Sequence, residues 1–494
     1  MAGGCYDKGV HGPCGRERLF IFCCRGKAMK QIIKHLQSGD WRALVASFLY
    51  FDTGFTVWLL YGPLAPFIVK DLALAPAEQG FLVAIPLFSA AILRVTLGNL
   101  YQAADGRWIA LLGIVLSALP PLVLVTLPGI PSLTLLLVLG VLLGMGGASF
   151  AVALPMAGSN YPPRIQGLVL GIAAAGNIGA VLDGLLFPPL ARHFGWEMAM
   201  SAALPLLLLA GIAIFFWARD RSPKSGSVRH AFAAFVANLI ALVLLVLAAH
   251  DGWLGLRGKA AMLTLPILGV FFAIAILPAR YREVLKERDT WVIILIYSIT
   301  FGGFVGMSAY VSLLLVNLYH LGMVEAGLFM SLLAFTGAMV RPLGGLVADQ
   351  ISGVRALRWF LSGIALADLL FALWTPPLAA GIAALLGLYL CFGLGNGATF
   401  QLVPHRWPGK SGLMTGLVGA AGGIGGFYLP VAMGIAKEST GDYHAGFAIF
   451  AALATGALVL VVALRRQWLI WSLPAHAPAE PAAGVPQAAA AAAD

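Results

Sequence analysis

Long apolar segments, separated by short polar stretches, make up most of this chain of 494 residues. Most of them hold about 20 apolar residues, the length an α-helix needs to cross a bilayer. None shows the alternation of apolar and polar residues typical of a membrane β-barrel. The pattern therefore predicts an all-α integral membrane protein. We expect about fourteen spans, over 43–69, 78–103, 107–127, 132–157, 165–192, 198–218, 231–249, 261–279, 291–316, 324–348, 356–375, 378–403, 412–436 and 444–464.

Two polar segments divide these spans into groups of six, two and six. "ARDRSPKSGSVRH" follows the sixth span, and "RYREVLKERD" follows the eighth. The two middle spans therefore resemble a helical hairpin inserted in a central loop. The predicted organisation is a cytoplasmic N-terminal tail (1–42), a six-helix half (43–218), a central loop with the inserted two-helix hairpin (219–290), a second six-helix half (291–464) and a disordered Ala/Pro tail (465–494).

The two six-span groups repeat each other in sequence. "GASFAVALP" at 147–155 matches the start of "GATFQLVPH" at 397–405, an offset of 250 residues. "GLVLGIAAAGNIG" at 167–179 is similar to "GLMTGLVGAAGGIG" at 412–425, an offset of 245. "YFDTGF" and "YSITFG" align loosely at 50 and 297. Matches in one order at nearly one offset predict two halves related by a parallel repeat, which a two-helix insertion leaves intact.

Composition and charge agree with a membrane protein and set its orientation. Hydrophobic residues make up 60% of the chain and charged residues 11%, far below the quarter typical of soluble domains. Of 31 Lys and Arg residues, 24 lie in cytoplasmic segments if the N-terminus is cytoplasmic, and only five at the opposite end. The positive-inside rule then places both termini in the cytoplasm and the chain, multi-pass, in the inner (plasma) membrane. The net charge of +10 reflects this topology, and we expect no nucleic-acid partner.

Arg94 and Arg341 lie deep inside apolar spans, 247 residues apart. An arginine at a helix centre costs about 2.5–3.5 kcal/mol on insertion scales, so it normally has a partner. The acids within spans are Asp52, Asp183 and Asp368, and none recurs at the repeat offset. A structural ion pair remains the alternative, but the symmetry favours an anion site between the halves. A guanidinium group suits that role because its planar fork binds flat oxyanions through two hydrogen bonds.

Glycines and aromatic residues surround these arginines in the sequence. Glycine at helix-packing spacing lets helices approach closely, which leaves a small cavity; we expect close crossings at Gly171, Gly176, Gly419 and Gly423. Asn177 adds an amide within a span. The aromatic residues that could wall the cavity are Phe55, Phe150, Tyr297, Phe301 and Phe400. Taken singly, each of these aromatic residues is more often a packing residue than a ligand contact.

Several segments resemble the nitrate/nitrite porter family of the major facilitator superfamily. "GIAAAGNIGAVLDGLLFPPLA" and "GLVGAAGGIGGFYLP" resemble its two glycine-rich nitrate signatures, and "RDTWVIILIYSITFGGFVGMSAY" and "MVRPLGGLVAD" resemble its seventh and eighth helices. The resemblance covers about 41–220 and 285–465. It implies transport of nitrate or nitrite by alternating access, and no enzymatic activity, cofactor or metal. The positions that match the family's substrate site are Arg94, Arg341, Asn177, Tyr297, Phe55, Phe150 and Phe301.

The loop motif of the superfamily is degraded in the first half. "GNLYQAADGRW" lacks the usual first acid, whereas "GGLVADQISGVR" keeps Asp349 and Arg355. This departure puts a symmetrical cytoplasmic latch in doubt and leaves the predicted anion site untouched.

The sequence also bears on other function classes and on how transport would be coupled. A redox subunit is disfavoured because all nine histidines lie near span ends or outside spans and no CxxC occurs, whereas haem in a helix bundle needs histidines within it. An anion channel or another small-oxyanion carrier stays open. Proton symport is favoured over nitrate/nitrite exchange by the resemblance, with Asp52 and Asp183 as the possible proton-coupling residues. The expected partners are nitrate or nitrite, protons and the bilayer.

Overall fold

The computed structural model describes residues 37–472, except 128, 163–164, 253–257, 277–278 and 409. Every secondary-structure element assigned in this part of the chain is a helix. Thirteen of them are long and apolar enough to cross a membrane, and Lys259–Phe272 is a shorter apolar helix. The predicted all-α membrane fold is therefore confirmed. The expected N-terminal tail with its four cysteines falls almost entirely on 1–36, and most of the Ala/Pro tail on 473–494, both outside the described residues.

Each half contains six membrane-crossing segments, several of them broken into shorter helices. The first half contains α2 (Trp41–Leu59), α3 (Tyr61–Leu72), α4 (Pro76–Ala103), α5 (Gly106–Thr126), α6 (Leu133–Ala148), α7 (Phe150–Gly158), α8 (Gln166–Ala174), η2 (Ala175–Ile178), α9 (Gly179–Phe194), α10 (Trp196–Ser201) and α11 (Ala203–Trp217). The second contains α15 (Arg288–Tyr319), α16 (Met323–Ile351), α17 (Gly353–Leu373), α18 (Leu378–Arg406), α19 (Ser411–Thr440) and α20 (His444–Ser472). Between them lie α12 (Val228–Asp251), α13 (Lys259–Ile276) and α14 (Ala279–Val284).

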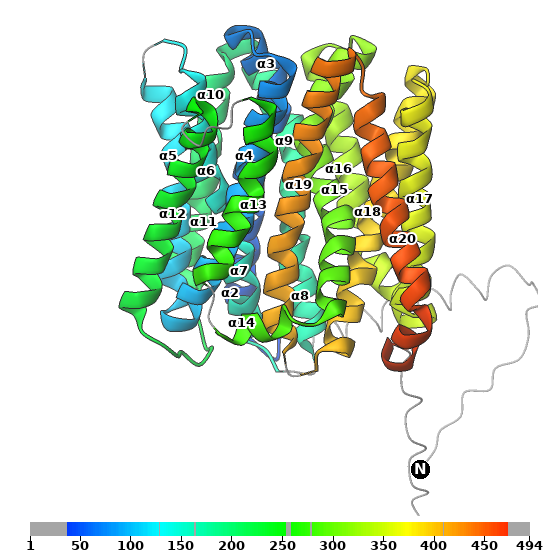
Figure 1. Cartoon of the computed structure of the whole chain (residues 1–494). Coiled ribbons are helices and arrows are strands. Elements are labelled where there is room, and N and C mark those ends of the chain that lie inside the picture. Colours follow the sequence, from blue (N-terminus) through cyan, green and yellow to red (C-terminus); the bar gives the residue numbers. More distant parts are fainter. Residues whose placement is uncertain are drawn as a thin grey trace, which may run out of the picture.

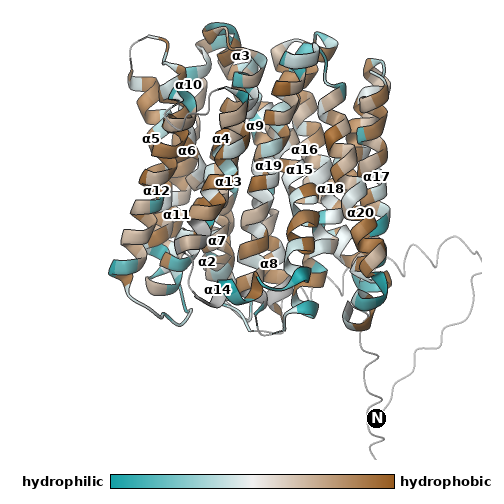
Figure 2. Ribbon diagram, in the orientation of Figure 1, coloured by the Kyte–Doolittle hydropathy of each residue, from teal (hydrophilic) through white to brown (hydrophobic). Residues whose placement is uncertain are grey.

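The two halves lie side by side, with blue to cyan helices on one side of Figure 1 and yellow to red helices on the other. Helix α2 begins, and α20 ends, at the end drawn lowest in Figure 1, which we call the lower end; α3 ends at the upper end. Apolar residues cover the helix lengths, and polar residues gather toward both ends (Figure 2). This distribution matches a bilayer that surrounds the middle of the bundle.

Polar side chains start several of the helices at the edges of the apolar segments. Asp40 accepts hydrogen bonds from the backbone N–H groups of Arg42 and Ala43 at the start of α2. Asp105 and Ser132 cap α5 and α6 in the same way. Such caps satisfy N–H groups that have no partner within the helix, so each span begins where the sequence changes from polar to apolar.

The last helix is longer than the sequence predicted. We expected a span to 464 and a disordered tail from 465, but α20 continues to Ser472. The reason is Trp468, which is fully buried and donates from its indole N–H to Asp289 Oδ1 at 2.9 Å. Asp289 also accepts from Arg406 Nε at 2.5 Å. This carboxylate therefore ties α20 to α15 and α18 at the lower end.

A second carboxylate, Asp220, organises the lower end of the first half. It lies after α11 and accepts hydrogen bonds from the Gly106 N–H at 2.8 Å and the Tyr101 hydroxyl at 3.0 Å. Burial raises the pKa of Asp220, but hydrogen bonds from Lys224, Ser222 and the Gly106 N–H outweigh that effect and hold its pKa below its usual value. The loop between α4 and α5 is thus held by an acid from outside the degraded motif.

The inserted hairpin packs on both halves. Helix α12 lies against α4 and α6, and α13 lies against α4 and α19. Asn238, fully buried in α12, donates to Thr96 Oγ1 in α4 at 3.0 Å. Lys259, at the start of α13, forms an ion pair with Glu438 of α19 at 3.0 Å. Helix α13 therefore lies across the boundary between the halves and packs on one helix from each.

Candidate functional site

Arg94 and Arg341 both contact the same aromatic ring. The guanidinium carbon of each is 6.0 Å from the ring centroid of Phe301 in α15. Each arginine also contacts a phenylalanine of its own half, Arg94 with Phe150 at 5.0 Å and Arg341 with Phe400 at 5.5 Å. Since these phenylalanines are equivalent in the sequence repeat, the repeat recurs as a pair of matching cation–π contacts. Each such contact stabilises a desolvated cation by up to about 2 kcal/mol.

Close glycine crossings hold these side chains in place in both halves. In the first half, Gly144 of α6 packs against the side chain of Ser89 and the backbone nitrogen of Ala90 in α4. In the second half, Gly344 of α16 packs on the backbone of Leu394 in α18, and Gly393 on the backbone of Gly337. A Cβ at these glycines would clash with backbone, so α4 and α16 can only approach α6 and α18 this closely through glycine.

The two arginines differ in how far the protein occupies their hydrogen-bond donors. Arg94 is 3% exposed and donates from Nε and Nη2 to the Gly147 carbonyl, at 3.2 and 2.8 Å. Its Nη1 donates to the Gly419 carbonyl of α19, in the other half, at 2.5 Å. Arg341 is partly exposed, and its Nη1 is buried with no hydrogen-bond partner among the described residues. Arg341 therefore has a donor free for an anion.

No acid neutralises either arginine in the part of the chain that the structure describes. None of the described carboxylates lies within 4.0 Å of either guanidinium group. Asp52, Asp183 and Asp368 are all buried, and each has at least one oxygen without a hydrogen-bond partner. The alternative of a structural ion pair is not supported, and two uncompensated positive charges in a low-dielectric site favour an anionic ligand.

The predicted aromatic residues divide into those at the arginines and one behind them. Tyr297 stacks on Phe301, with centroids 5.1 Å apart, and meets Phe400 edge-on at 4.9 Å. Phe55 is fully buried and packs on Trp58 at 5.3 Å, and no guanidinium contact is found for it. Phe55 therefore supports the site from a second layer.

Trp58 is a site residue that sequence reasoning missed. Its ring lies 5.4 Å from the guanidinium carbon of Arg94, and its indole N–H donates to the Pro86 carbonyl at 2.8 Å. The repeat gave no hint of it, because the position one offset later is Val305. Its spacing of three residues from Phe55 on one helix was the available signal, since such residues share a face.

Asn177 and Gly176 lie where η2 meets its neighbours, and Gly423 lies where α19 crosses α4. Helix η2 packs against α2 and α16, and the buried Asn177 has an amide oxygen without a partner. A Cβ on Gly176 would lie 2.9 Å from the Asp52 nitrogen, and one on Gly423 would lie 2.8 Å from Ala91 Cβ. Both glycines therefore lie at close helix crossings.

The other two predicted glycines have more room. A Cβ on Gly419 would be 3.5 Å from the Phe150 ring and 3.6 Å from the nearest Arg94 nitrogen, which is ordinary contact beside the arginine. A Cβ on Gly171 would meet no described atom within 4 Å. The expectation of a close crossing at Gly171 is wrong, because this glycine lies on an exposed face of α8.

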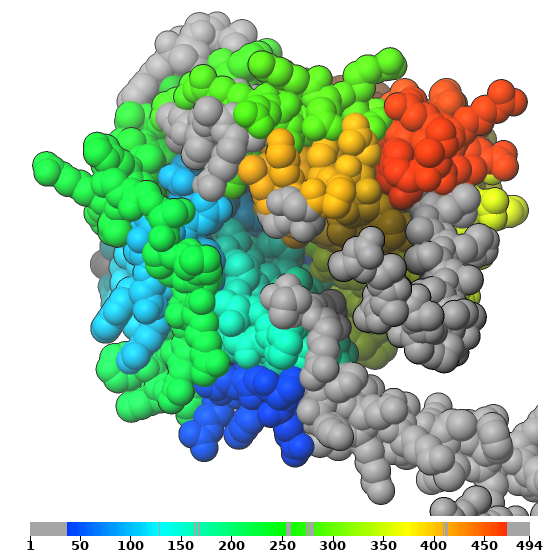
Figure 3. Space-filling model, turned by 90° about the horizontal axis from the view of Figure 1, so that it is seen from below, coloured from blue at the N-terminus to red at the C-terminus, as the bar shows by residue number. Residues whose placement is uncertain are grey.

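The halves meet tightly above the arginines. A Cβ on Gly62 of α3 would lie 2.9 Å from Ala309 Cα in α15, and Gly184 of α9 packs on the Gly327 carbonyl of α16. These contacts lie toward the upper end. In contrast, Arg341 and Phe400 are partly exposed, and the lower face is recessed between the teal and olive atoms of the two halves (Figure 3). The close contacts between the halves therefore lie on the upper side of the arginines, and Arg341 is less enclosed than Arg94.

Comparisons with known proteins place this architecture in a family. Residues 46–430 match the model of the Major Facilitator Superfamily. The chain is 28% identical over 419 residues to a nitrite extrusion protein of Bacillus subtilis, covering 85% of this chain and 91% of that protein. It is 30% identical over 402 residues to a probable nitrate/nitrite transporter, NarK2, of Mycobacterium tuberculosis, covering 81% of this chain and 90% of that protein.

A solved structure agrees with the fold. A partially occluded inward open conformation of the xylose transporter XylE from E. coli has a TM-score of 0.60 and 13% sequence identity, and the match covers 86% of this chain and 98% of that one. At this identity the similarity concerns the fold alone. The matched family model and the curated relatives show that this chain belongs to the nitrate/nitrite porter family of the Major Facilitator Superfamily.

Proposed function

We propose that this protein carries nitrate, and also nitrite, across the plasma membrane by alternating access. The observation that supports this most directly is that both arginines contact Phe301, while none of the described carboxylates lies within 4.0 Å of either guanidinium group. A flat monovalent oxyanion can accept two hydrogen bonds from a planar guanidinium group, and the aromatic rings beside both arginines offer it flat neighbours. The names of the relatives, which are nitrate and nitrite transporters, agree with this substrate class.

The arrangement of the halves supports a carrier rather than a channel. One arginine comes from each half, and Arg94 also donates to the Gly419 carbonyl across the boundary. A rocking motion of the halves would therefore change the site as it changes access. With the lower end cytoplasmic, as the distribution of Lys and Arg predicts, the close contacts between the halves toward the upper end support a state that is closed to the outside.

Coupling to protons is the finer part of the proposal. Inward movement of one negative charge costs about 2.3 kcal/mol per 100 mV of inside-negative potential. Symport with more than one proton per nitrate would move net positive charge inward, so the potential would then favour uptake. Asp52 in α2 and Asp183 in α9 are buried, interact electrostatically, and have three oxygens between them without a hydrogen-bond partner. A buried, unpaired carboxyl group can bind a proton from one side and release it to the other.

Exchange of nitrate for nitrite is the second candidate. It needs no proton, because one anion replaces another of equal charge. The relative named as a nitrite extrusion protein favours it, and so does the cost of moving an empty site with two uncompensated arginines.

Reconstituted protein distinguishes these mechanisms in one experiment. Proteoliposomes are loaded with buffer or with nitrite, an inside-negative potential and an inward proton gradient are imposed, and external nitrate is followed. Under symport, nitrate enters buffer-loaded vesicles, and a protonophore abolishes the uptake. Under exchange, only nitrite-loaded vesicles take up nitrate, with no need for a proton gradient. Failure of nitrate to enter under either condition would refute the proposed substrate.

The Asp183→Asn variant tests the proton step separately from substrate binding. Asparagine keeps the shape of the buried side chain and cannot carry a proton. We expect proton-driven uptake to be lost, while exchange of internal for external nitrate continues. Asp368→Asn is the matched control, because Asp368 is equally buried but lies in α17. Normal proton-driven uptake by Asp183→Asn would remove this residue from the mechanism.

A further inference from the structure

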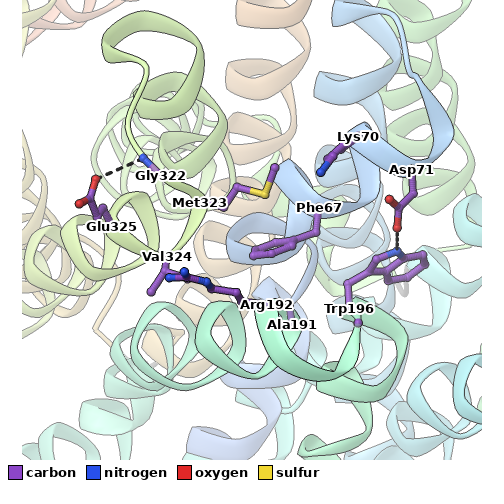
Figure 4. Close-up of a pocket in the computed structure, with 11 residues that line it drawn as sticks. Phe67, Lys70, Asp71, Ala191, Arg192, Trp196, Gly322, Met323, Val324 and Glu325 are labelled. Carbon is purple, nitrogen blue, oxygen red and sulfur yellow. Dashed lines mark hydrogen bonds between the residues drawn. The ribbon is translucent and has the colours of Figure 1, made fainter.

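A pocket of about 590 Å³ opens at the upper end, between the two halves. Figure 4 shows the ends of α3 and α9 with α10 on one side and the start of α16 on the other. It lies beyond the contacts that close the halves above the arginines, so it is separate from the site described above. Its lining residues are Phe67, Lys70, Asp71, Ala191, Arg192, Gly195, Trp196, Gly322, Met323, Val324 and Glu325.

Each acid of this pocket accepts a hydrogen bond through one carboxylate oxygen, and neither of its two cations forms an ion pair among the described residues. Asp71 Oδ2 accepts a hydrogen bond from the Trp196 indole N–H at 3.0 Å. Glu325 Oε2 accepts from the Gly322 N–H at 3.2 Å, as part of the cap of α16. No described carboxylate lies within 4.0 Å of Lys70 or Arg192. Both cations therefore keep their donors available.

The start of α16 adds a third positive contribution. Met323 and Val324 are its first two residues, so their backbone N–H groups have no acceptor within the helix. In Figure 4 the Arg192 side chain extends from α9 to Val324, and Lys70 faces the same space from α3. The aligned peptide dipoles of a 29-residue helix favour an anion at this end.

We propose that this pocket is a second, outer anion site, at which Lys70, Arg192 and the start of α16 collect a small oxyanion before it reaches the central arginines. The assignment of nitrate as that anion, and of this end as extracellular, rests on the proposed function. The pocket's formal charges cancel, so binding is weak and depends on local contacts. A weak site suits an entrance, because a tightly held anion would not move on.

The double variant Lys70→Gln/Arg192→Gln tests the site through transport kinetics. We expect KM for external nitrate to rise roughly three- to tenfold at low ionic strength with little change in kcat, because charges at an entrance act on encounter rates. The increase should shrink in high salt, which screens exposed charges. Lys437→Gln is the matched control: it removes one charge at the same end, where the amine donates to the Gly441 carbonyl outside the pocket. Arg192→Lys keeps the positive charge, so its KM for external nitrate should stay close to that of the wild-type protein.

Bromide provides a direct reading that does not depend on nitrate transport. Crystals soaked in bromide should show an anomalous peak between Lys70 and Arg192 in the wild-type protein and none in the double variant. Three results would overturn the outer site. The first two are an unchanged KM for external nitrate in the double variant and an equal rise of that KM in Lys437→Gln. The third is the absence of the bromide peak in the wild-type protein. If the outer site fails while Arg341→Lys still weakens nitrate binding, the proposed function stands. If wild-type protein does not move nitrate but bromide binds here, the function fails and the site remains.

Discussion

Replacement of Arg341 by lysine isolates the anion contact from the stability of the protein. Arg341 has a buried Nη1 with no protein partner, so its donors are available to substrate. Lysine keeps the charge but loses the planar two-pronged contact. Loss of one charge-assisted hydrogen bond costs about 1.5–3 kcal/mol, which corresponds to roughly a tenfold to hundredfold weaker Kd. We therefore expect Arg341→Lys to bind nitrate about 10 to 100 times more weakly, with a wild-type melting temperature.

Arg94→Lys should behave differently, although the two positions are equivalent in the repeat. Arg94 donates three hydrogen bonds to the carbonyls of Gly147 and Gly419. Lysine cannot reach both carbonyls with one ammonium group in the same geometry, and a buried acceptor without a partner costs about 1–3 kcal/mol. We expect this variant to lose both nitrate affinity and thermal stability.

The assay pairs nitrate titration calorimetry with thermal unfolding of purified protein in detergent. Arg355→Lys, at an exposed position in α17, is the control for the chemical change itself. The reasoning would be refuted by an Arg341→Lys protein whose Kd stays within threefold of wild type. It would also be refuted if Arg341→Lys, rather than Arg94→Lys, lowered the melting temperature more.

Three further variants test other parts of the structure. Phe301→Leu removes the ring that both arginines contact and should raise the KM for nitrate about tenfold, whereas Phe304→Leu, one turn away, should not; equal effects in uptake assays would contradict a shared ring. Gly176→Leu should abolish expression of folded protein, because its Cβ would clash with backbone, and Gly171→Leu should be tolerated; size-exclusion profiles check both. Asp220→Asn should lower the melting temperature at pH 7. The pKa of Asp220 is below its usual value, so the stability that this carboxylate contributes is fully present above the unfolded-state pKa of about 3.9 and is lost as the pH falls further. The difference in melting temperature between the variant and the wild type should therefore shrink toward pH 3. A difference in melting temperature that grows on acidification would exclude this role.

The sequence by itself determined the class of fold and predicted an anion site at its centre. Apolar segments of about 20 residues can only be satisfied as membrane helices, because a bilayer offers no hydrogen bonds to the backbone. The cost of burying Arg94 and Arg341, at equivalent places in a repeat, pointed to an anion without any knowledge of their neighbours. Helix α20 shows where this local reasoning stops, because its last turns depend on the hydrogen bond between Trp468 and Asp289.

The tertiary structure alone decided which donors are free and which residues touch. Arg94 and Arg341 are equal in the repeat, yet the Gly147 and Gly419 carbonyls occupy the first and leave Nη1 of the second without a partner. Trp58 reaches Arg94 although it has no counterpart in the other half. Helix periodicity and burial cost are properties of a local segment, so they can be read from the chain. Contacts between residues hundreds of positions apart depend on how the helices cross, and only the folded molecule fixes that.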